Sequence, residues 1–215
     1  MTITLKAGST VMFTGDSISS FVRPPGEDRA AYALQAAGRW CFEHPDRPLT
    51  WLNTAHPGDT VTDLEARWQT DVLDARPDVL SILVGINDVG RRTILPEAPV
   101  ISTEEYADTY DRLLKPLADT ELILVEPFLL HVSAVVEAGP HGVLIGDQER
   151  EEWRADLEPK IEVVHELATR YDAELLEADR LFTALDTPER WSEDGVHLTA
   201  AGHSVLAEAW LELVG

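Results

Sequence analysis

Three polar residues near opposite ends of the sequence have the types that nucleophilic acyl transfer requires. Ser17 and the preceding Asp16 follow the apolar run Val11–Gly15, while Asp194 and His197 stand three positions apart near the C-terminal end. At that spacing both side chains can face the same way, so a carboxylate can hold one imidazole nitrogen while the other nitrogen faces a serine. This pattern favours Ser17 as a nucleophile that is activated by a base and an orienting acid.

Acyl transfer also needs hydrogen-bond donors for the negative oxygen of its intermediate. Asn87 follows a buried run and a glycine, and its amide can donate, as can the backbone N–H groups of Ser17 and Gly58. Taken singly, each feature also has an ordinary structural interpretation. Asp16-Ser17 is typical of a helix cap, Asn87-Asp88 of an Asx turn, and Gly58 of a loop before a helix.

The surrounding pattern alternates strand and helix along the chain, which favours an α/β three-layer sandwich with a parallel sheet. We expect strands at residues 10–15, 48–53, 79–84, 121–125 and 173–177. We expect helices at residues 28–43, 59–75, 102–118, 148–171, 179–185 and 199–213, and Pro159 is expected to kink or split the fourth of these. Residues 91–101 and 129–147 are expected to be irregular loops. Because parallel strands end at one edge, Ser17, Gly58, Asn87 and the Asp194–His197 segment can converge there.

Composition limits the classes of partner that the protein can have. The chain has 215 residues, 17 Lys and Arg against 39 Asp and Glu, and a net charge of −22, so nucleic acid and anionic membranes are disfavoured as partners. Its length suits a single domain over residues 1–215. Cys41 is the only cysteine, which excludes an intrachain disulfide and a cysteine-based zinc site. We see neither a signal peptide nor a membrane-spanning run, and we therefore expect a cytoplasmic protein.

Four short blocks, taken together and in this order, resemble the GDSL/SGNH hydrolase superfamily. The blocks are Gly15-Asp16-Ser17-Ile18, the glycine Gly58, Gly85-Ile86-Asn87-Asp88 and Asp194-Gly195-Val196-His197. In the first block, isoleucine stands where the nominal motif has leucine. The matches extend over essentially the whole chain, and their combination is far more specific than any one block.

The resemblance implies a flavodoxin-like sheet of five parallel strands in the order 2-1-3-4-5. It implies Ser17 as the nucleophile, His197 as general base and then acid, and Asp194 as the orienting acid. The N–H groups of Ser17 and Gly58 and the amide of Asn87 would form the oxyanion hole. Ester hydrolysis through an acyl-serine intermediate would then proceed without a metal or another cofactor.

Within that superfamily the chain looks most like intracellular bacterial acetylxylan esterases and related carbohydrate acetylesterases. The residues that carry this likeness are Thr60–Trp68, Gly85–Val89, Leu95-Pro96 and Glu126–Phe128. The implied substrate is a small acetylated sugar or short xylo-oligosaccharide, and the resemblance leads us to expect a homo-oligomer. The chain departs from those esterases at positions 90 and 91, where it has Gly-Arg and they tend to have Trp-Arg.

Two other functions remain open on the sequence alone. The same catalytic residues would serve a lysophospholipase, thioesterase or arylesterase, and a non-catalytic binding protein with this fold is the alternative outside enzymes. The long-chain lipid alternative is disfavoured because the chain has no long apolar insertion. The alternative without catalysis is disfavoured because Ser17, Asn87, Asp194 and His197 are all present.

A few other residues fall on the expected loops. His131 and Trp191 are candidates for substrate contact, and Arg91 is a candidate for contact with substrate or a neighbouring subunit, although packing or solvation is an equally ordinary role for each. Trp40, Trp68 and Trp210 stand at helical core spacing and are assigned to the core. The histidines have no metal-ligand spacing among themselves.

Overall fold

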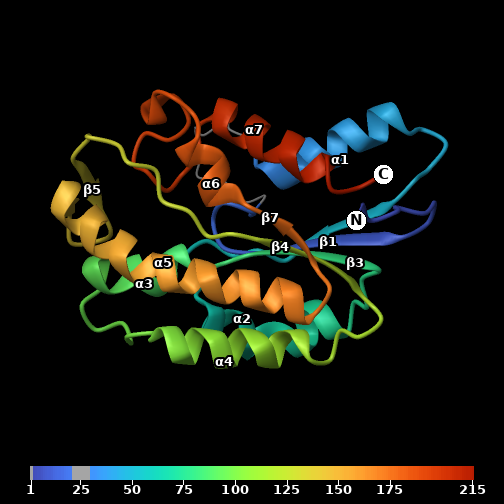
Figure 1. Cartoon of the computed structure of the whole chain (residues 1–215), viewed down its shortest axis with the longest axis horizontal. Coiled ribbons are helices and arrows are strands. Elements are labelled where there is room, and N and C mark those ends of the chain that lie inside the picture. The colour runs from blue at the N-terminus through green and yellow to red at the C-terminus, as the bar shows by residue number, and fades with distance from the viewer. Residues whose placement is uncertain (1, 21–29) are drawn as a thin grey trace.

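The fold is organised around a five-stranded parallel sheet, seen in the computed structural model of the chain (Figure 1), which describes residues 2–20 and 30–215. The strand order is β2-β1-β3-β4-β7, which is the order 2-1-3-4-5 among the strands of this sheet. This is the α/β architecture that the sequence predicts. The strands are β1 (Thr10–Gly15), β2 (Thr50–Asn53), β3 (Val79–Leu83), β4 (Glu121–Val125) and β7 (Glu174–Leu176).

The central strands are buried on both faces because their sequences are almost continuously apolar. Every residue of β3 is buried, and Val11, Met12 and Phe13 of β1 are fully buried. The register aligns the last residues of the two strands, with Gly15 of β1 opposite Leu83 of β3. Loops that leave these two strands therefore start side by side at one edge of the sheet.

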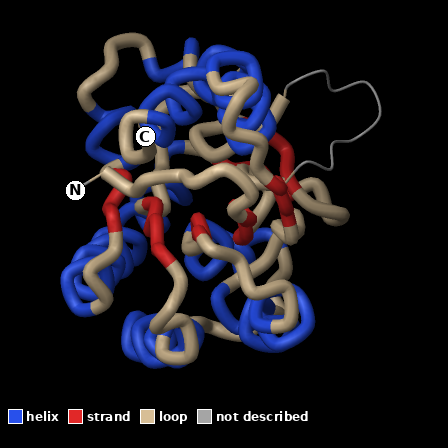
Figure 2. The backbone as a smooth tube through the Cα atoms, turned by 90° about the vertical axis from the view of Figure 1, so that its right-hand side faces the viewer, coloured by secondary structure: helices blue, strands red, loops and turns tan. Residues whose placement is uncertain are grey.

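Helices cover both faces of the sheet, and Figure 2 shows the strands in a row between two groups of helices. The contacts α1 with α7, α2 with α4, and α4 with α5 define the two layers. Trp40 and Trp210 pack in one core and Trp68 in the other, as expected from their spacing. The helices are α1 (Tyr32–Glu43), α2 (Val61–Trp68), α3 (Ile86–Ile94), α4 (Thr103–Leu114), α5 (Asp147–Arg170), α6 (Ala178–Thr183) and α7 (Ala200–Leu211).

Helix starts follow the capping residues that the sequence contains. Thr60 precedes α2, where its hydroxyl accepts the N–H of Asp63 and the Asp63 carboxylate accepts the N–H of Thr60. Ser102 accepts the N–H of Glu105 at the start of α4. Thr199 accepts the N–H of Gly202 at the start of α7.

The structure differs from the expected elements in four places. Helix α3 (Ile86–Ile94) extends into the expected loop 91–101, and the expected loop 129–147 contains the hairpin β5 (Val136–Ala138) and β6 (Val143–Ile145). The helix that begins at Val61 changes to a π-helical turn at Gln69–Leu73. Helix α5 runs through Pro159 without a break. The first helix is described from Tyr32, and residues 28 and 29 of its expected range lie outside the described residues.

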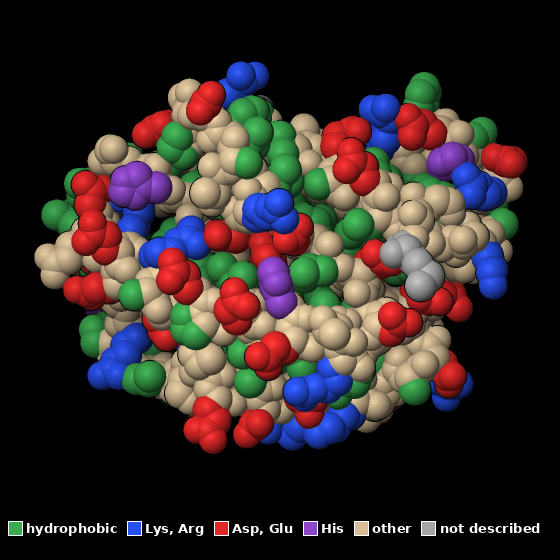
Figure 3. Space-filling model, viewed as in Figure 1, with side chains coloured by type: hydrophobic (Ala, Val, Ile, Leu, Met, Phe, Trp, Pro, Cys, Tyr) green, Lys and Arg blue, Asp and Glu red, His purple; other side chains and the backbone are tan. Residues whose placement is uncertain are grey.

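Acidic side chains are scattered over the face seen in Figure 3, with lysine and arginine side chains among them. This distribution agrees with the net charge of −22. Among the described residues, no helix combines the length and the apolar character that crossing a membrane would require.

Candidate active site

Ser17, His197 and Asp194 form a continuous chain of hydrogen bonds at the carboxyl edge of the sheet. The Ser17 Oγ lies 3.1 Å from the His197 Nε2, and the His197 Nδ1 lies 2.7 Å from the Asp194 Oδ2. The structure therefore brings together three residues that are up to 180 positions apart in sequence. The His197 side chain is 54% exposed, so a substrate has direct access to it.

The Asp194 carboxylate is held by its own loop as well as by the imidazole. Its Oδ1 accepts the N–H groups of Val196 at 2.8 Å and His197 at 2.7 Å, and the Ser192 hydroxyl lies 3.1 Å away. Burial opposes ionisation of this group, but the hydrogen bonds from His197 and Val196 outweigh it and lower the pKa to about 2. Asp194 is therefore a charged acceptor at neutral pH, which suits an orienting acid.

Gly15 lets the chain place Ser17 at the sheet edge. Its φ is +132°, and a Cβ atom there would lie 1.9 Å from the carbonyl oxygen of Leu83 on β3. No other residue fits such close backbone contact. The turn continues with Asp16, whose N–H donates to the Leu83 carbonyl oxygen at 3.2 Å. The glycine of the first block is thus explained by the neighbouring strand.

Asp16 is a buried carboxyl group directly before Ser17. Its Oδ1 accepts the Ile18 N–H at 3.0 Å, and its Oδ2 is buried with no hydrogen-bond partner in the described part of the chain. Burial raises the pKa of Asp16 to about 7, although the Ile18 N–H and the nearby His197 act in the opposite direction. Asp16 stabilises the turn that carries Ser17 by accepting the Ile18 N–H.

The loop of Gly58 is tied to β1 and to Asn87, which lies in the first turn of α3. The His56 N–H donates to the Gly15 carbonyl oxygen at 3.0 Å, which brings the loop containing Gly58 beside the turn of Ser17. The Asn87 Nδ2 donates to the Asp59 carbonyl oxygen at 3.0 Å. That bond fixes the orientation of the amide through one of its two N–H groups.

Asp88 completes the junction between these loops. Its Oδ1 accepts the N–H of Val61 at 3.0 Å, so α3 supplies a hydrogen-bond acceptor to the first turn of α2. Burial raises the pKa of Asp88 to about 7, against the effect of the Val61 N–H. The adjacent side chains of Asn87 and Asp88 thus bond to the backbone of Asp59 and Val61, so the third block of the sequence fixes the end of the Gly58 loop.

Arg67 holds the loop that contains Gly58 through bonds to Thr54 and Asp59. Its guanidinium donates to the Asp59 carboxylate at 2.7 Å, to the Thr54 carbonyl oxygen at 2.6 Å and to Asp71 at 2.6 Å. Arg91, a candidate from the sequence for contact with substrate or a neighbouring subunit, pairs with Asp63 near the start of α2. The spacing of Arg67 and Asp71 on one helix predicts their ion pair, but nothing in the sequence predicts the contact of Arg67 with the loop of Gly58.

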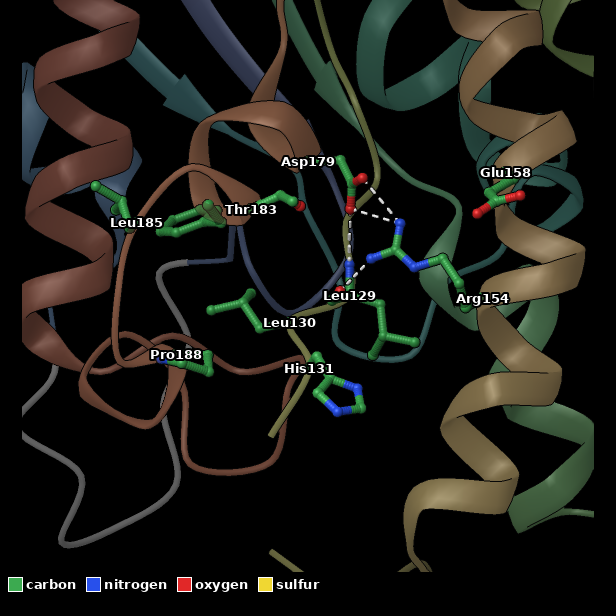
Figure 4. A pocket seen from close by; sticks show the side chains of 10 residues that line it. Leu129, Leu130, His131, Arg154, Glu158, Asp179, Thr183, Leu185 and Pro188 are labelled. Atoms are coloured by element: carbon green, nitrogen blue, oxygen red, sulfur yellow. Dashed lines mark hydrogen bonds and ion pairs between the residues drawn. The ribbon is translucent and has the colours of Figure 1, made fainter. Parts of the chain in front are cut away.

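His131 and Trp191, the other two candidates for substrate contact, each have neighbours that the sequence does not reveal. His131 lines a cavity of about 480 Å³ between α5, α6 and the segment after β4, and Figure 4 shows it at one end of that cavity. The Trp191 indole donates to the Asp186 carbonyl oxygen at 3.0 Å, and the Arg190 guanidinium lies 4.8 Å from its ring. Trp191 therefore has structural partners of its own.

Three residues of metal-ligating type meet in a place that their sequence spacing does not indicate. Glu126, His165 and Glu177 each bring one ligand atom within 4.8 Å of the others. The Glu126 carboxylate already contacts the His165 imidazole and accepts the Asp179 N–H at 2.9 Å at the start of α6. Its oxygens are thus engaged in holding α5 and α6 to the end of β4.

Comparison with known proteins gives a family for this geometry. The GDSL-like Lipase/Acylhydrolase family matches residues 13–205. An acetylxylan esterase of Geobacillus stearothermophilus is 30% identical over 219 residues, which cover 97% of this chain and 95% of that protein. Crystal structures of catalytic mutants of that esterase carry alanine in place of a serine or a histidine.

Solved structures agree over nearly the whole chain. A putative GDSL-like lipase from Parabacteroides merdae has a TM-score of 0.83 and 27% identity, covering 99% of this chain and 98% of its own. The acetylxylan esterase Axe2 of Geobacillus stearothermophilus has a TM-score of 0.74 and 28% identity, covering 97% and 94%. The chain therefore belongs to the GDSL-like lipase/acylhydrolase family and is a carboxylic ester hydrolase.

Proposed function

We propose that this protein is a serine esterase that removes acetyl groups from short sugars or xylo-oligosaccharides. The observation that carries the mechanism is the chain of hydrogen bonds from Ser17 Oγ through His197 to Asp194. The acetyl preference rests on the 30% identity to an acetylxylan esterase. An ester with a longer acyl chain, a thioester or an aryl ester is the alternative within the same mechanism.

In the first half of the reaction, the Ser17 Oγ attacks the acyl carbon while the His197 Nε2 takes its proton. Asp194 holds the Nδ1–H side of the imidazole and stabilises the imidazolium that forms. The intermediate's negative oxygen accepts hydrogen bonds from the N–H groups of Ser17 and Gly58 and from the Asn87 amide. The imidazolium then protonates the departing alcohol oxygen, which leaves the acyl group on Ser17.

In the second half, water replaces the alcohol. His197 removes a proton from the water as it attacks the acyl-serine, and returns that proton to the Ser17 Oγ as the carboxylic acid leaves. No atom outside the chain, the ester and water takes part. The exposed imidazole of His197 gives both the alcohol and the water a route to the reacting carbon.

Labelling and substitution test the nucleophile. A fluorophosphonate should label Ser17 in the folded protein, and Ser17→Ala should abolish both the labelling and esterase activity. The matched control is Ser204→Ala, because the Ser204 hydroxyl donates to Gln35 on α1 and to the Ala200 carbonyl on α7, two groups that the mechanism does not use. Wild-type activity in the Ser17→Ala variant would contradict the proposed mechanism.

Acyl-chain length tests the substrate class. We expect nitrophenyl acetate to react faster than the butyrate, octanoate and decanoate esters, and we expect acetate release from acetylated xylo-oligosaccharides. A rate that rises for acyl chains longer than butyrate would favour long-chain esters as the substrate class. Faster cleavage of acyl thioesters would favour thioesters. The proposal includes action in the cytoplasm on imported oligosaccharides and a homo-oligomeric state, which cell fractionation and light scattering check.

A further inference from the structure

Arg150 is a buried arginine that reaches the backbone of the loop carrying Asp194. It lies in the first turn of α5, and its side chain is only 3% exposed. Its Nε donates to the Asp194 carbonyl oxygen at 3.1 Å, and its Nη1 donates to the Val132 carbonyl oxygen at 3.1 Å. One side chain therefore joins the loop of the catalytic acid to the segment that follows β4.

These two segments also touch directly at the next residue. The Leu130 N–H donates to the Gly195 carbonyl oxygen at 2.8 Å. Gly195 has a φ of +90°, and a Cβ atom there would lie 2.7 Å from the Leu130 carbonyl oxygen and 3.4 Å from the Arg150 Nε. The peptide between Asp194 and Gly195 is thus held by a guanidinium on one carbonyl and by a backbone N–H on the next.

An arginine is a costly choice here if fold stability is its only role. Its nearest acidic partner is the mostly exposed Asp147 carboxylate, 3.9 Å away, and its Nη2 is buried without a hydrogen-bond partner in the described part of the chain. Desolvating a guanidinium with incomplete hydrogen bonding is unfavourable, and an apolar side chain of similar volume is often neutral or stabilising in such a place. The presence of arginine therefore calls for another explanation.

We propose that Arg150 is a positioning residue for ester hydrolysis, which fixes the backbone of Asp194 so that its carboxylate stays on the imidazole of His197. The inference rests on the proposed function, because it takes His197 as the base. The Asp194 Oδ2 lies 2.7 Å from the His197 Nδ1, and a tilt of the Asp194 peptide would lengthen that bond. A misplacement of about 1 Å can cost about 10²-fold in rate.

Arg154 offers a matched control on the same helix. It stands one turn further along α5, donates to the Leu129 carbonyl oxygen and pairs with Asp179 at 2.8 Å, as Figure 4 shows. In the part of the chain that the structure describes, it forms no hydrogen bond or ion pair with residues 192–198. Arg150→Met and Arg154→Met therefore remove the same group from one helix, but only the first removes a bond to the loop of Asp194.

The test measures kcat and KM for nitrophenyl acetate, the pH profile of kcat/KM, and the thermal midpoint of each variant. For Arg150→Met we expect kcat to fall about 10- to 100-fold with little change in KM. We expect the acid-side inflection of the profile to move to lower pH, because a loosened Asp194 stabilises the imidazolium less. Arg154→Met should lose thermal stability while it keeps the kcat and the pH profile of the wild type.

Two further measurements keep the inference separable from the proposed function. Imidazole NMR resonances of His197 should shift in Arg150→Met and stay in place in Arg154→Met, which requires no turnover. Arg150→Lys, which keeps a cation and one donor, should recover part of kcat and serves if the methionine variant does not fold. If Ser17→Ala is inactive but both Arg150 variants keep wild-type kcat, pH profile and His197 resonances, the inference is wrong. If Ser17→Ala stays active, the proposed function fails instead.

Discussion

Replacing Asp194 by asparagine separates the charge of this residue from its shape. An asparagine can keep one oxygen on the Val196 and His197 N–H groups, and it then turns its NH₂ group toward the His197 Nδ1. Since that nitrogen must then accept, its proton moves to Nε2, where it faces the Ser17 Oγ. An imidazole in this tautomer cannot take the serine proton, and the equivalent change in serine proteases lowers kcat by roughly 10⁴-fold.

The structure also gives a stability effect for the same change. The pKa of Asp194 falls from 3.8 to about 2, and at 1.36 kcal/mol per unit this corresponds to about 2 kcal/mol in favour of the charged form. A carboxyl group with a lowered pKa stabilises the fold at pH values above its pKa in the unfolded chain. This contribution is therefore present at pH 7 and is lost as the pH falls from about 4 to about 2. We expect Asp194→Asn to lose up to that amount at pH 7.

The assay compares Asp194→Asn with the exposed Asp186→Asn, which changes the same chemical group in the same region. Initial rates on nitrophenyl acetate give kcat, and urea unfolding at pH 7 gives the free energy of unfolding. We expect kcat to fall by about 10³- to 10⁴-fold in the first variant and to stay unchanged in the second. More than a tenth of wild-type kcat in a folded Asp194→Asn protein would refute the assignment of the orienting acid.

Three further predictions concern Gly15, Asn87 and Asp16. Gly15→Ala should destabilise the protein by at least about 2 kcal/mol in urea unfolding, because its Cβ would meet the Leu83 carbonyl oxygen at 1.9 Å; wild-type stability would contradict this reason. Asn87→Ala should lower kcat about 10²- to 10³-fold with little effect on KM, and an unchanged kcat would exclude the amide from the oxyanion hole. The pKa of Asp16 is raised from 3.8 to about 7, so the folded protein binds a proton that the unfolded chain has lost, and stability should fall as the pH rises between these values. Asp16→Asn should reduce that slope in unfolding measurements, and Asp88, whose pKa is also about 7, should maintain part of it.

The sequence predicts the sheet well because its strands are marked by composition. The expected strands 10–15 and 121–125 match the structure at both ends, and 79–84 differs by one residue. A continuous apolar run has only one good environment in a soluble α/β protein, between two layers of helices. The parallel arrangement then brings Ser17 and Asn87 to one edge, as predicted.

Short and distant features are harder to predict from the sequence. Strands β5 and β6 have three residues each, too few for a periodic pattern, although Gly139 and Gly142 do mark their turn. Helix α3 is hard to predict because it starts directly after Gly85 and has in its first turn the polar pair Asn87-Asp88, which is typical of an Asx turn. Pro159 has a low helical propensity, but the helix continues through it because residues on both sides of Pro159, such as Leu157 and Ile161, are buried.

The partners of charged residues depend on tertiary packing, which the sequence does not show. Arg150 stands among acidic residues and reads as part of a solvated helix surface, yet it contacts a carbonyl 44 positions away. Arg67 similarly joins Asp59 and Thr54 through contacts that no local pattern reveals. The order and types of Ser17, Asp194 and His197 predicted that they would meet, whereas no pattern predicted the arginines that hold the neighbouring loops.

The position of the Asp194 loop depends on whether the first turn of helix α5 stays folded. Its 24 residues span about 36 Å, with Arg150 near the first turn and His165 near the last. Local opening that frays only the Asp147 end would release the loop of Asp194 while the sheet stays folded. Activity is then governed by the free energy of that local opening rather than by the global free energy of unfolding. In mild denaturant the protein should therefore become inactive before its sheet unfolds.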